Sequence, residues 1–257
     1  MVRASGVLPD DLTSDALTAD FRLLQRRRGH RFSLDDLATA WVAARARPEA
    51  RVALDLGCGI GSVLLMIAWR LSRARCFGIE AQEISFALAQ HNVIENGVSE
   101  RVTVDLGDLR ELARLKAYPP CDLVTGTPPY LPLGTALLSP DPQRAAARIE
   151  LRGGVEDYLL AASRVLAPDG RAVVCADGRF PARVRCGAVA AGLTPLQRVD
   201  VFARASARDP LLAVWTCAPL AAEPGPLHVE RIVMRDERGE RSPAALEMRR
   251  FFGLDLV

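Results

Sequence analysis

Short apolar runs alternate along the chain with longer stretches of mixed apolar and polar residues, from residue 51 onward. Apolar runs of this length are typical of buried strands, and mixed stretches are typical of helices with one apolar side. The pattern predicts strands near 51–56, 75–80, 101–106, 121–126, 171–176, 196–203 and 211–217. Helices are expected at roughly 61–72, 83–96, 153–167 and 179–191. Such alternation indicates an α/β fold, a doubly wound and mostly parallel sheet of seven strands.

The flanks of this repeating part carry patterns of their own. Only a turn around 208–210 separates the last two predicted strands, which favours an antiparallel hairpin. Residues 1–50 predict a helical stretch from Thr13, a polar ribbon over 20–31, and a helix over 33–45 capped by Ser33. Residues 219–257 predict a Pro-rich connector, a strand over 227–234 and a helix begun by Ser242. We therefore expect an extension (1–50), a main domain (51–218) and a tail (219–257).

Composition narrows the class of protein without naming a function. The chain has 257 residues, 49% of them hydrophobic, and a net charge of +2, so it can bury one core and any nucleic-acid surface must be local. Residues 1–10 lack the pattern of a secretory leader, and the apolar run 62–69 is too short to span a bilayer, so we expect a cytoplasmic protein. Six scattered cysteines and three separated histidines predict buried thiols, no metal site and no catalytic triad.

A glycine-rich turn over 54–62 is the strongest local motif. It leaves a predicted strand, passes through Gly57, Gly59 and Gly61, and enters a helix, so a ligand can lie directly on its backbone. A dinucleotide fingerprint counted from Gly57 requires glycine at position 62, where Ser62 stands, which disfavours a nicotinamide cofactor. Glu80 ends the next strand, where its carboxylate could accept both hydroxyls of a ribose.

Two acidic residues each allow two interpretations. Asp108 follows the third strand, where it could meet an adenine ring or cap a helix over 109–116. Together, the Asp-x-Gly-x-Gly-x-Gly turn, Glu80, Asp108 and the strand end over 122–130 resemble class I S-adenosylmethionine-dependent methyltransferases, whose sheet is Rossmann-like. The resemblance implies S-adenosylmethionine as cofactor, its methionine part on the glycine turn and its amino group above Asp55, which could also cap the turn amides. The cofactor-binding residues expected are Asp55, Gly57, Cys58, Gly59, Gly61, Glu80, Ala81, Asp108, Leu109 and Thr127.

The segment Thr127-Pro128-Pro129-Tyr130 follows the fourth predicted strand, at the edge where open α/β sheets bind ligands. It resembles the Asp/Asn-Pro-Pro-Tyr motif of methyltransferases that modify an adenine, a cytosine or a protein glutamine amide. The resemblance implies that Thr127 and the carbonyl of Pro128 accept the amine hydrogens while Tyr130 stacks on the substrate. Thr127 departs from the motif, because a neutral hydroxyl is a weaker acceptor than a carboxylate or amide. A rigid exit from the strand is the alternative interpretation.

The segment over 25–36 resembles the Gln-x-x-x-Gly-Tyr/His-Arg-Phe-Ser-x-Asp segment of bacterial tRNA adenine-N6 methyltransferases that act on a valine tRNA. Segments 89–97 and 145–150 recur in the same family. The resemblance implies a mouth over the active site and tRNA as the partner. The arginines of the segment over 25–36 could bind an RNA backbone or form a solvated surface. The substrate-binding residues expected are Arg28, His30, Arg31, Phe32, Pro129 and Tyr130.

Three other functions remain open from the sequence. A protein glutamine-amide methyltransferase would need a groove for an extended peptide rather than a basic rim. A small-molecule methyltransferase would use the loop over 131–144 as a lid, and Thr127 would then mark a changed acceptor geometry. A cofactor-binding partner subunit without catalysis would keep the glycine turn and lose turnover.

Overall fold

The computed structural model describes residues 10–220 and 225–254. Residues 1–9, for which the sequence predicts no leader, and residues 221–224 of the Pro-rich connector lie outside the described residues. Within the described ranges, no helix is long and apolar enough to cross a membrane. The same ranges contain no cluster of three or more His, Cys, Asp or Glu side chains that could hold a metal ion.

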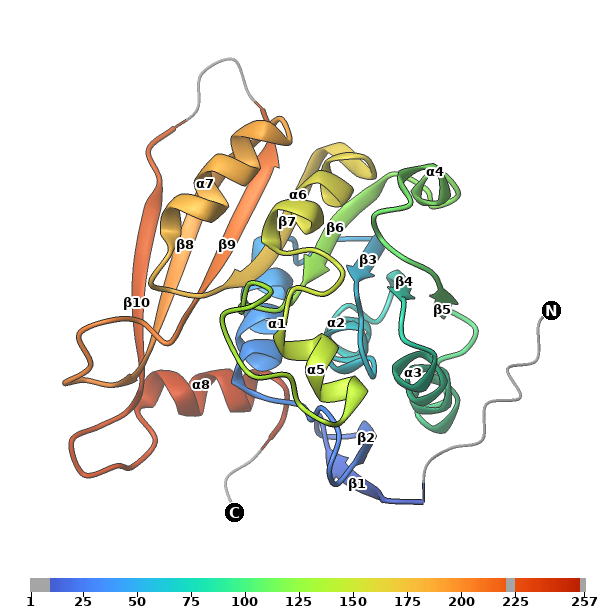
Figure 1. The fold of residues 1–257 in the computed structure, drawn as a ribbon, viewed down its shortest axis with the longest axis horizontal. Helices are drawn as coiled ribbons and strands as arrows, with labels where there is room; N and C mark the ends of the chain where they lie inside the picture. Colours follow the sequence, from blue (N-terminus) through green and yellow to red (C-terminus); the bar gives the residue numbers. More distant parts are fainter. Residues whose placement is uncertain (1–9, 221–224, 255–257) are drawn as a thin grey trace.

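One eight-stranded sheet forms the centre of the molecule (Figure 1). Its strand order is β10-β8-β9-β7-β6-β3-β4-β5, and only β9 runs antiparallel to its neighbours. The strands are β3 (Val52–Leu56), β4 (Arg75–Glu80), β5 (Val102–Leu106), β6 (Cys121–Gly126), β7 (Leu166–Ala176), β8 (Leu193–Arg204), β9 (Leu212–Pro219) and β10 (His228–Arg235). The doubly wound, mostly parallel sheet with an antiparallel hairpin is therefore confirmed. The predicted number of seven strands is wrong, because β10 pairs in parallel with β8 instead of standing apart.

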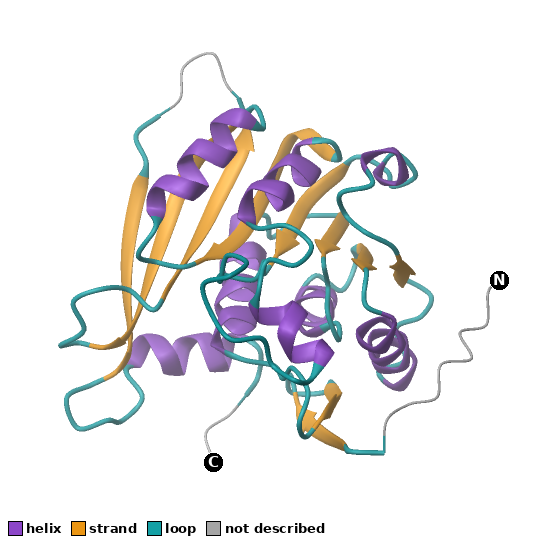
Figure 2. Cartoon of the chain, viewed as in Figure 1, coloured by secondary structure: helices purple, strands orange, loops and turns teal. Residues whose placement is uncertain are grey.

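Helices cover both faces of the sheet (Figure 2). On one face lie α1 (Leu34–Ala46), α2 (Ser62–Arg70), α3 (Glu83–Glu95) and α8 (Pro243–Phe251); on the other lie α4 (Leu112–Leu115), α6 (Val155–Ser163) and α7 (Pro181–Ala190). Successive strand residues alternate between the two layers: Leu123 packs with the first group and Val124 with the second. Each fully buried aliphatic side chain of this kind contributes about 1.5–3 kcal/mol.

The register of three central strands brings the predicted site together. Leu56 at the end of β3 pairs with Ile79 of β4 on one side and with Gly126 of β6 on the other. The residues that follow are the glycine turn, Glu80 and Thr127, so all three lie at one edge of the sheet. Ligands bind at this edge in open α/β sheets because the strand order reverses there and leaves a crevice.

The amino-terminal extension begins with a hairpin, so the predicted helical stretch from Thr13 is wrong. β1 (Leu12–Ala16) pairs antiparallel with β2 (Arg22–Arg26), and Thr13 lies opposite Gln25. At the turn, the backbone N–H of Phe21 donates to the hydroxyl of Thr18 at 3.0 Å. Five residues make a poor isolated helix, whereas the hairpin gains cross-strand hydrogen bonds and contacts with α3.

Three smaller expectations are also corrected. Residues 142–148 form α5 (Pro142–Arg148), which begins inside the loop expected over 131–144, because Asp141 accepts the backbone N–H of Arg144 at 3.0 Å and Pro142 begins the first turn. Asp108 does not cap the following helix, which starts only after Glu111. Cys186 is exposed, whereas the other five cysteines are buried as predicted. The domain boundaries at 50 and 218 stay a prediction.

Candidate active site

The glycine turn joins β3 to α2 through three residues with left-handed backbones. Gly57, Gly59 and Gly61 have φ angles of 58°, 56° and 89°, a region that strongly favours glycine. The turn is tied to the next strand, because the N–H of Cys58 donates to the carbonyl of Ile79 at 3.0 Å. The sequence therefore folds here into a fixed backbone surface at the amino end of a helix.

Glu80 reaches this surface from the end of β4. One carboxylate oxygen accepts the N–H of Gly59 at 2.8 Å, and the other accepts the N–H of Gln82 at 2.7 Å. The side chain is only 8% exposed, and burial raises its pKa above the usual value. Each oxygen keeps a second lone pair, so the carboxylate can still accept two ligand hydroxyls.

A pocket lies over the turn and Glu80. Of the residues predicted to bind cofactor, eight line it: Gly57, Cys58, Gly59, Glu80, Ala81, Asp108, Leu109 and Thr127. Asp55 and Gly61 do not line it. Asp55 lies beneath the turn, 3% exposed, where it accepts the hydroxyl of Thr125 at 2.7 Å; burial raises its pKa to about 7. Gly61 instead faces α3, since a Cβ there would stand 3.6 Å from the Cβ of Ala89.

Asp108 is held in an ionised state at the pocket wall. Its carboxylate accepts the backbone N–H of Arg110 at 2.9 Å and pairs with the guanidinium of the same residue at 2.6 Å. These bonds lower the pKa of Asp108. The aspartate therefore offers a negative acceptor at physiological pH.

Several further residues line the pocket although they lie outside the motifs recognised in the sequence. Tyr158 comes from α6, and its phenol oxygen lies 2.2 Å from where a Cβ on Gly57 would stand. The ring also lies 2.5 Å from a hypothetical Cβ on Gly126, so two glycines make room for one tyrosine. Only long-range packing reveals this contact. Asp36, Gln82, Ser85 and Arg152 line the pocket as well.

A second, open cleft of about 730 Å³ joins the pocket, and Thr127 and His30 line both. Pro128 and Tyr130 line the cleft, whereas Pro129 lies in the wall of the cofactor pocket. Burial lowers the pKa of His30, which keeps the imidazole neutral at the junction. The arrangement can present a second molecule to the contents of the pocket beside Thr127.

Tyr130 is firmly held within the cleft wall. Its hydroxyl lies 2.8 Å from the Sγ of Cys175 and donates to the carboxylate of Asp35 at 3.4 Å. Burial raises the pKa of Tyr130 well above the usual value, so it stays protonated. The ring also packs against the core cluster around α1. Its position is thus fixed before any substrate arrives.

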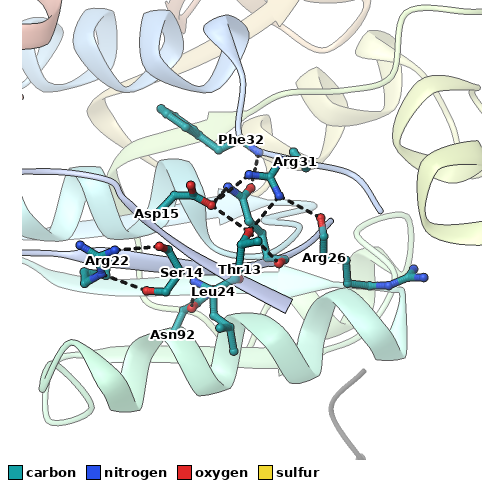
Figure 3. A network of polar contacts seen from close by, with 10 residues as sticks. Thr13, Ser14, Asp15, Arg22, Leu24, Arg26, Arg31, Phe32 and Asn92 are labelled. Carbon is teal, nitrogen blue, oxygen red and sulfur yellow. Dashed lines mark hydrogen bonds and ion pairs between the residues drawn. The ribbon is translucent and has the colours of Figure 1, made fainter. Parts of the chain in front are cut away.

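Some residues of the segment over 25–36 line the cleft, whereas others form ion pairs or pack in the core. Figure 3 shows the guanidinium of Arg31 turned toward Asp15, with which it pairs at 2.9 Å, although Arg31 also lines the cleft. Phe32 packs against the core, and Arg28 is exposed and lines neither cavity. Of the predicted basic patch, Arg26 is paired with Asp11 and with Asp141. The patch therefore does not form one continuous basic surface.

Other arginines complete the cleft. Arg144 and Arg148 stand one turn apart on α5, both are exposed, and both line the cleft, as does Arg27. Helix α5 and the segment around His30 lie close together, since the N–H of His30 donates to Gln143 at 3.2 Å. The resemblance of segment 145–150 to the tRNA methyltransferases does not by itself place these arginines in the site. Their i, i+4 spacing on a capped helix was the available signal.

Comparisons with known proteins show which chains this one is similar to. A family described as methyltransferase domain matches residues 53–131. The tRNA1(Val) (adenine(37)-N6)-methyltransferase of Porphyromonas gingivalis is 35% identical over 120 residues, which span 46% of this chain and about half, 46%, of that relative. A release factor glutamine methyltransferase of Geobacter sulfurreducens is 34% identical over 113 residues, 44% of this chain and 38% of that protein.

A solved structure and a longer match extend the comparison. The crystal structure of a predicted O-methyltransferase from Agrobacterium tumefaciens has a TM-score of 0.63 at 19% identity and covers 86% of this chain and 98% of its own, which shows the class I methyltransferase fold. The tRNA1(Val) (adenine(37)-N6)-methyltransferase of Musicola paradisiaca is 32% identical over 215 residues, 80% of this chain and 80% of that protein. This chain therefore belongs to the tRNA1(Val) (adenine(37)-N6)-methyltransferase family.

Proposed function

We propose that this protein transfers the methyl group of S-adenosylmethionine to the exocyclic amine of an adenine in a tRNA. One observation carries the proposal: the cofactor-type pocket opens beside Thr127 into a cleft rimmed by exposed arginines. The proposed substrate implies a cytoplasmic enzyme, as the sequence predicts.

The residues present fit S-adenosylmethionine. Gly59 leaves open space above the turn, since a Cβ there would meet no protein atom within 4 Å. The carboxylate of Glu80 is held by two backbone amides with acceptor capacity left for ribose hydroxyls. Asp108 and Leu109 would flank the adenine end. When bound, the cofactor supplies an electrophilic methyl group on a sulfonium.

The chain's contribution to the reaction is orientation and exclusion of water. An exocyclic adenine amine is a weak nucleophile, because its lone pair is delocalised into the ring. The Thr127 hydroxyl and the Pro128 carbonyl would accept its two hydrogens and so direct the lone pair at the methyl group. Tyr130 would stack on the base. No side-chain base is required, because the amine can release its proton to water after transfer.

Recognition of tRNA would rest on phosphate contacts at the cleft rim. Arg27, Arg144 and Arg148 are exposed there, and none of them takes part in an ion pair within residues 10–220 and 225–254. Free guanidinium groups bind phosphates in a bidentate manner. This basic rim favours RNA over the peptide groove that a glutamine-amide acceptor would need.

Labelled S-adenosylmethionine tests the proposal. The protein is incubated with bulk tRNA from a strain that lacks the enzyme, with protein extract, or with a metabolite pool. We expect label in the tRNA fraction, and digestion should yield N6-methyladenosine. Unlabelled tRNA beside a labelled protein or metabolite fraction would refute the tRNA assignment.

Two variants test the role of the Thr127–Tyr130 segment. Tyr130→Ala is expected to lower the methylation rate more than Thr127→Ala, because the stacked base loses its platform whereas the Pro128 carbonyl remains. Tyr130→Phe is the matched control, since it keeps the ring and removes only the hydroxyl that contacts Asp35 and Cys175. A larger loss in Thr127→Ala would contradict the stacking role.

A further inference from the structure

Asp36 is a buried carboxylate in the wall of the cofactor pocket. It lies in the first turn of α1, belongs to the amino-terminal extension, and is only 5% exposed. One of its oxygens accepts the backbone N–H of Ser33 at 3.0 Å. The hydroxyl of Ser62, the first residue of α2, lies beside it. The carboxylate therefore faces the end of the glycine turn.

The charges around Asp36 are unfavourable in the free protein. Two further carboxyl groups, Asp35 and Asp55, lie near it, and each disfavours a negative charge on Asp36. None of the ion pairs within the described ranges includes Asp36. Burial, with these neighbours, raises its pKa well above the usual value. A buried carboxyl group without a cation therefore keeps a proton, and a positive charge on a bound ligand would favour its ionised form.

Asp36 lies nearer to the expected position of the cofactor's methionine part than to that of its ribose. Glu80 contacts Gly59 and accounts for the ribose, whereas Asp36 contacts Ser62 at the helix end of the turn. The methionine part lies on this turn in the proposed function. Its carboxylate would be repelled by Asp36 and attracted by the amino end of α2, and its ammonium would be attracted by Asp36.

We propose that the Asp36 carboxylate binds the ammonium group of the cofactor's methionine part; this inference rests on the proposed function. The ammonium replaces the missing cation and gives the carboxylate a charge-assisted hydrogen bond. Because Asp36 stands on α1, cofactor binding also fixes the start of this helix. The adjacent Asp35 lines the acceptor cleft instead, so the two neighbouring carboxylates face different cavities.

A binding cycle tests the assignment without turnover. S-adenosylhomocysteine and its analogue with hydrogen in place of the amino group are titrated into the full chain by calorimetry. A charge-assisted bond predicts that the wild type prefers the amino compound by about 10- to 100-fold. In Asp36→Asn this preference should fall at least tenfold. Asp35→Asn is the matched control: it removes a neighbouring charge but leaves the Asp36 carboxylate, so the preference should not fall.

Two outcomes overturn the inference alone. The wild type could bind both nucleosides equally, or the preference could be lost in Asp55→Asn and kept in Asp36→Asn, which would move the ammonium to Asp55. If Asp36→Asn fails to fold, which its thermal unfolding would reveal, equal binding of the two nucleosides by the wild type still overturns the inference. Absence of any binding of S-adenosylhomocysteine would overturn the proposed function as well as this inference.

Discussion

Alanine at Gly59 is expected to weaken cofactor binding while costing the fold little. The backbone of Gly59 has a φ of 56°, and a Cβ there would meet no protein atom within 4 Å. Gly59 also lines the pocket, so the methyl group would project into space that the proposed cofactor needs. The substitution thus separates binding from stability.

The stability cost follows from the backbone alone. A left-handed alanine costs about 1–2 kcal/mol, and the reduced entropy of the unfolded chain offsets about 0.4–1 kcal/mol of it. The net loss of about 1 kcal/mol corresponds to a fall in Tm of about 2–4 °C for a chain of this size. Gly97→Ala is the matched control, since Gly97 has a φ of 65°, no atom within 4 Å of its Cβ position, and no place in the pocket.

Gly57→Ala provides the contrasting case. Its Cβ would stand 2.2 Å from the phenol oxygen of Tyr158, on a backbone with φ 58°. Overpacking adds about 1–3 kcal/mol to the backbone cost. We therefore expect Gly57→Ala to unfold at a clearly lower temperature than both Gly59→Ala and Gly97→Ala.

Thermal unfolding without ligand and titration with S-adenosylhomocysteine are the two assays. Gly59→Ala and Gly97→Ala should share the same small fall in Tm. Gly97→Ala should bind like the wild type, whereas Gly59→Ala should bind at least tenfold more weakly, a loss of about 1.4 kcal/mol. Equal affinity of the two variants would refute the placement of the cofactor over the glycine turn.

Three further predictions follow from buried groups. The Asp55 pKa of about 7 means that the folded chain keeps a proton that the unfolded chain releases near pH 4, so the contribution of Asp55 to folding stability is fully present below about pH 4 and is lost as pH rises to about 7; Asp55→Asn should flatten that decline in Tm. Asn92→Ala should destabilise by about 2–4 kcal/mol, because Asn92 bonds both backbone groups of Leu24 and the carbonyl of Ile60, and denaturant unfolding should find a smaller loss for the more exposed Asn96→Ala. A thiol reagent should modify Cys186 rapidly in the native chain and the five buried cysteines only after unfolding; rapid modification of two or more would contradict the buried core.

Local sequence determined the strands of the main domain, its four longer helices and the glycine turn. Buried strands need continuous apolar residues, and alternating faces such as Leu123 and Val124 give the sheet its two layers. The turn needs glycine where φ is positive, so the spacing of Gly57, Gly59 and Gly61 encodes its geometry within a few residues. Each of these features depends on residues close together in the chain, so each could be predicted from the sequence.

Tertiary structure alone decided which distant segments share a surface. Residues 12–16 form a strand because β2, which packs on α3, offers a partner for it, and 228–235 joins the sheet because the edge of β8 is open to it. Tyr158 and Asp36 reach the pocket from helices about a hundred and twenty residues apart in the chain, a closeness that no local pattern encodes. Asp36 is buried without a paired cation only in the folded chain, so its proposed role in cofactor binding could not be predicted from the sequence.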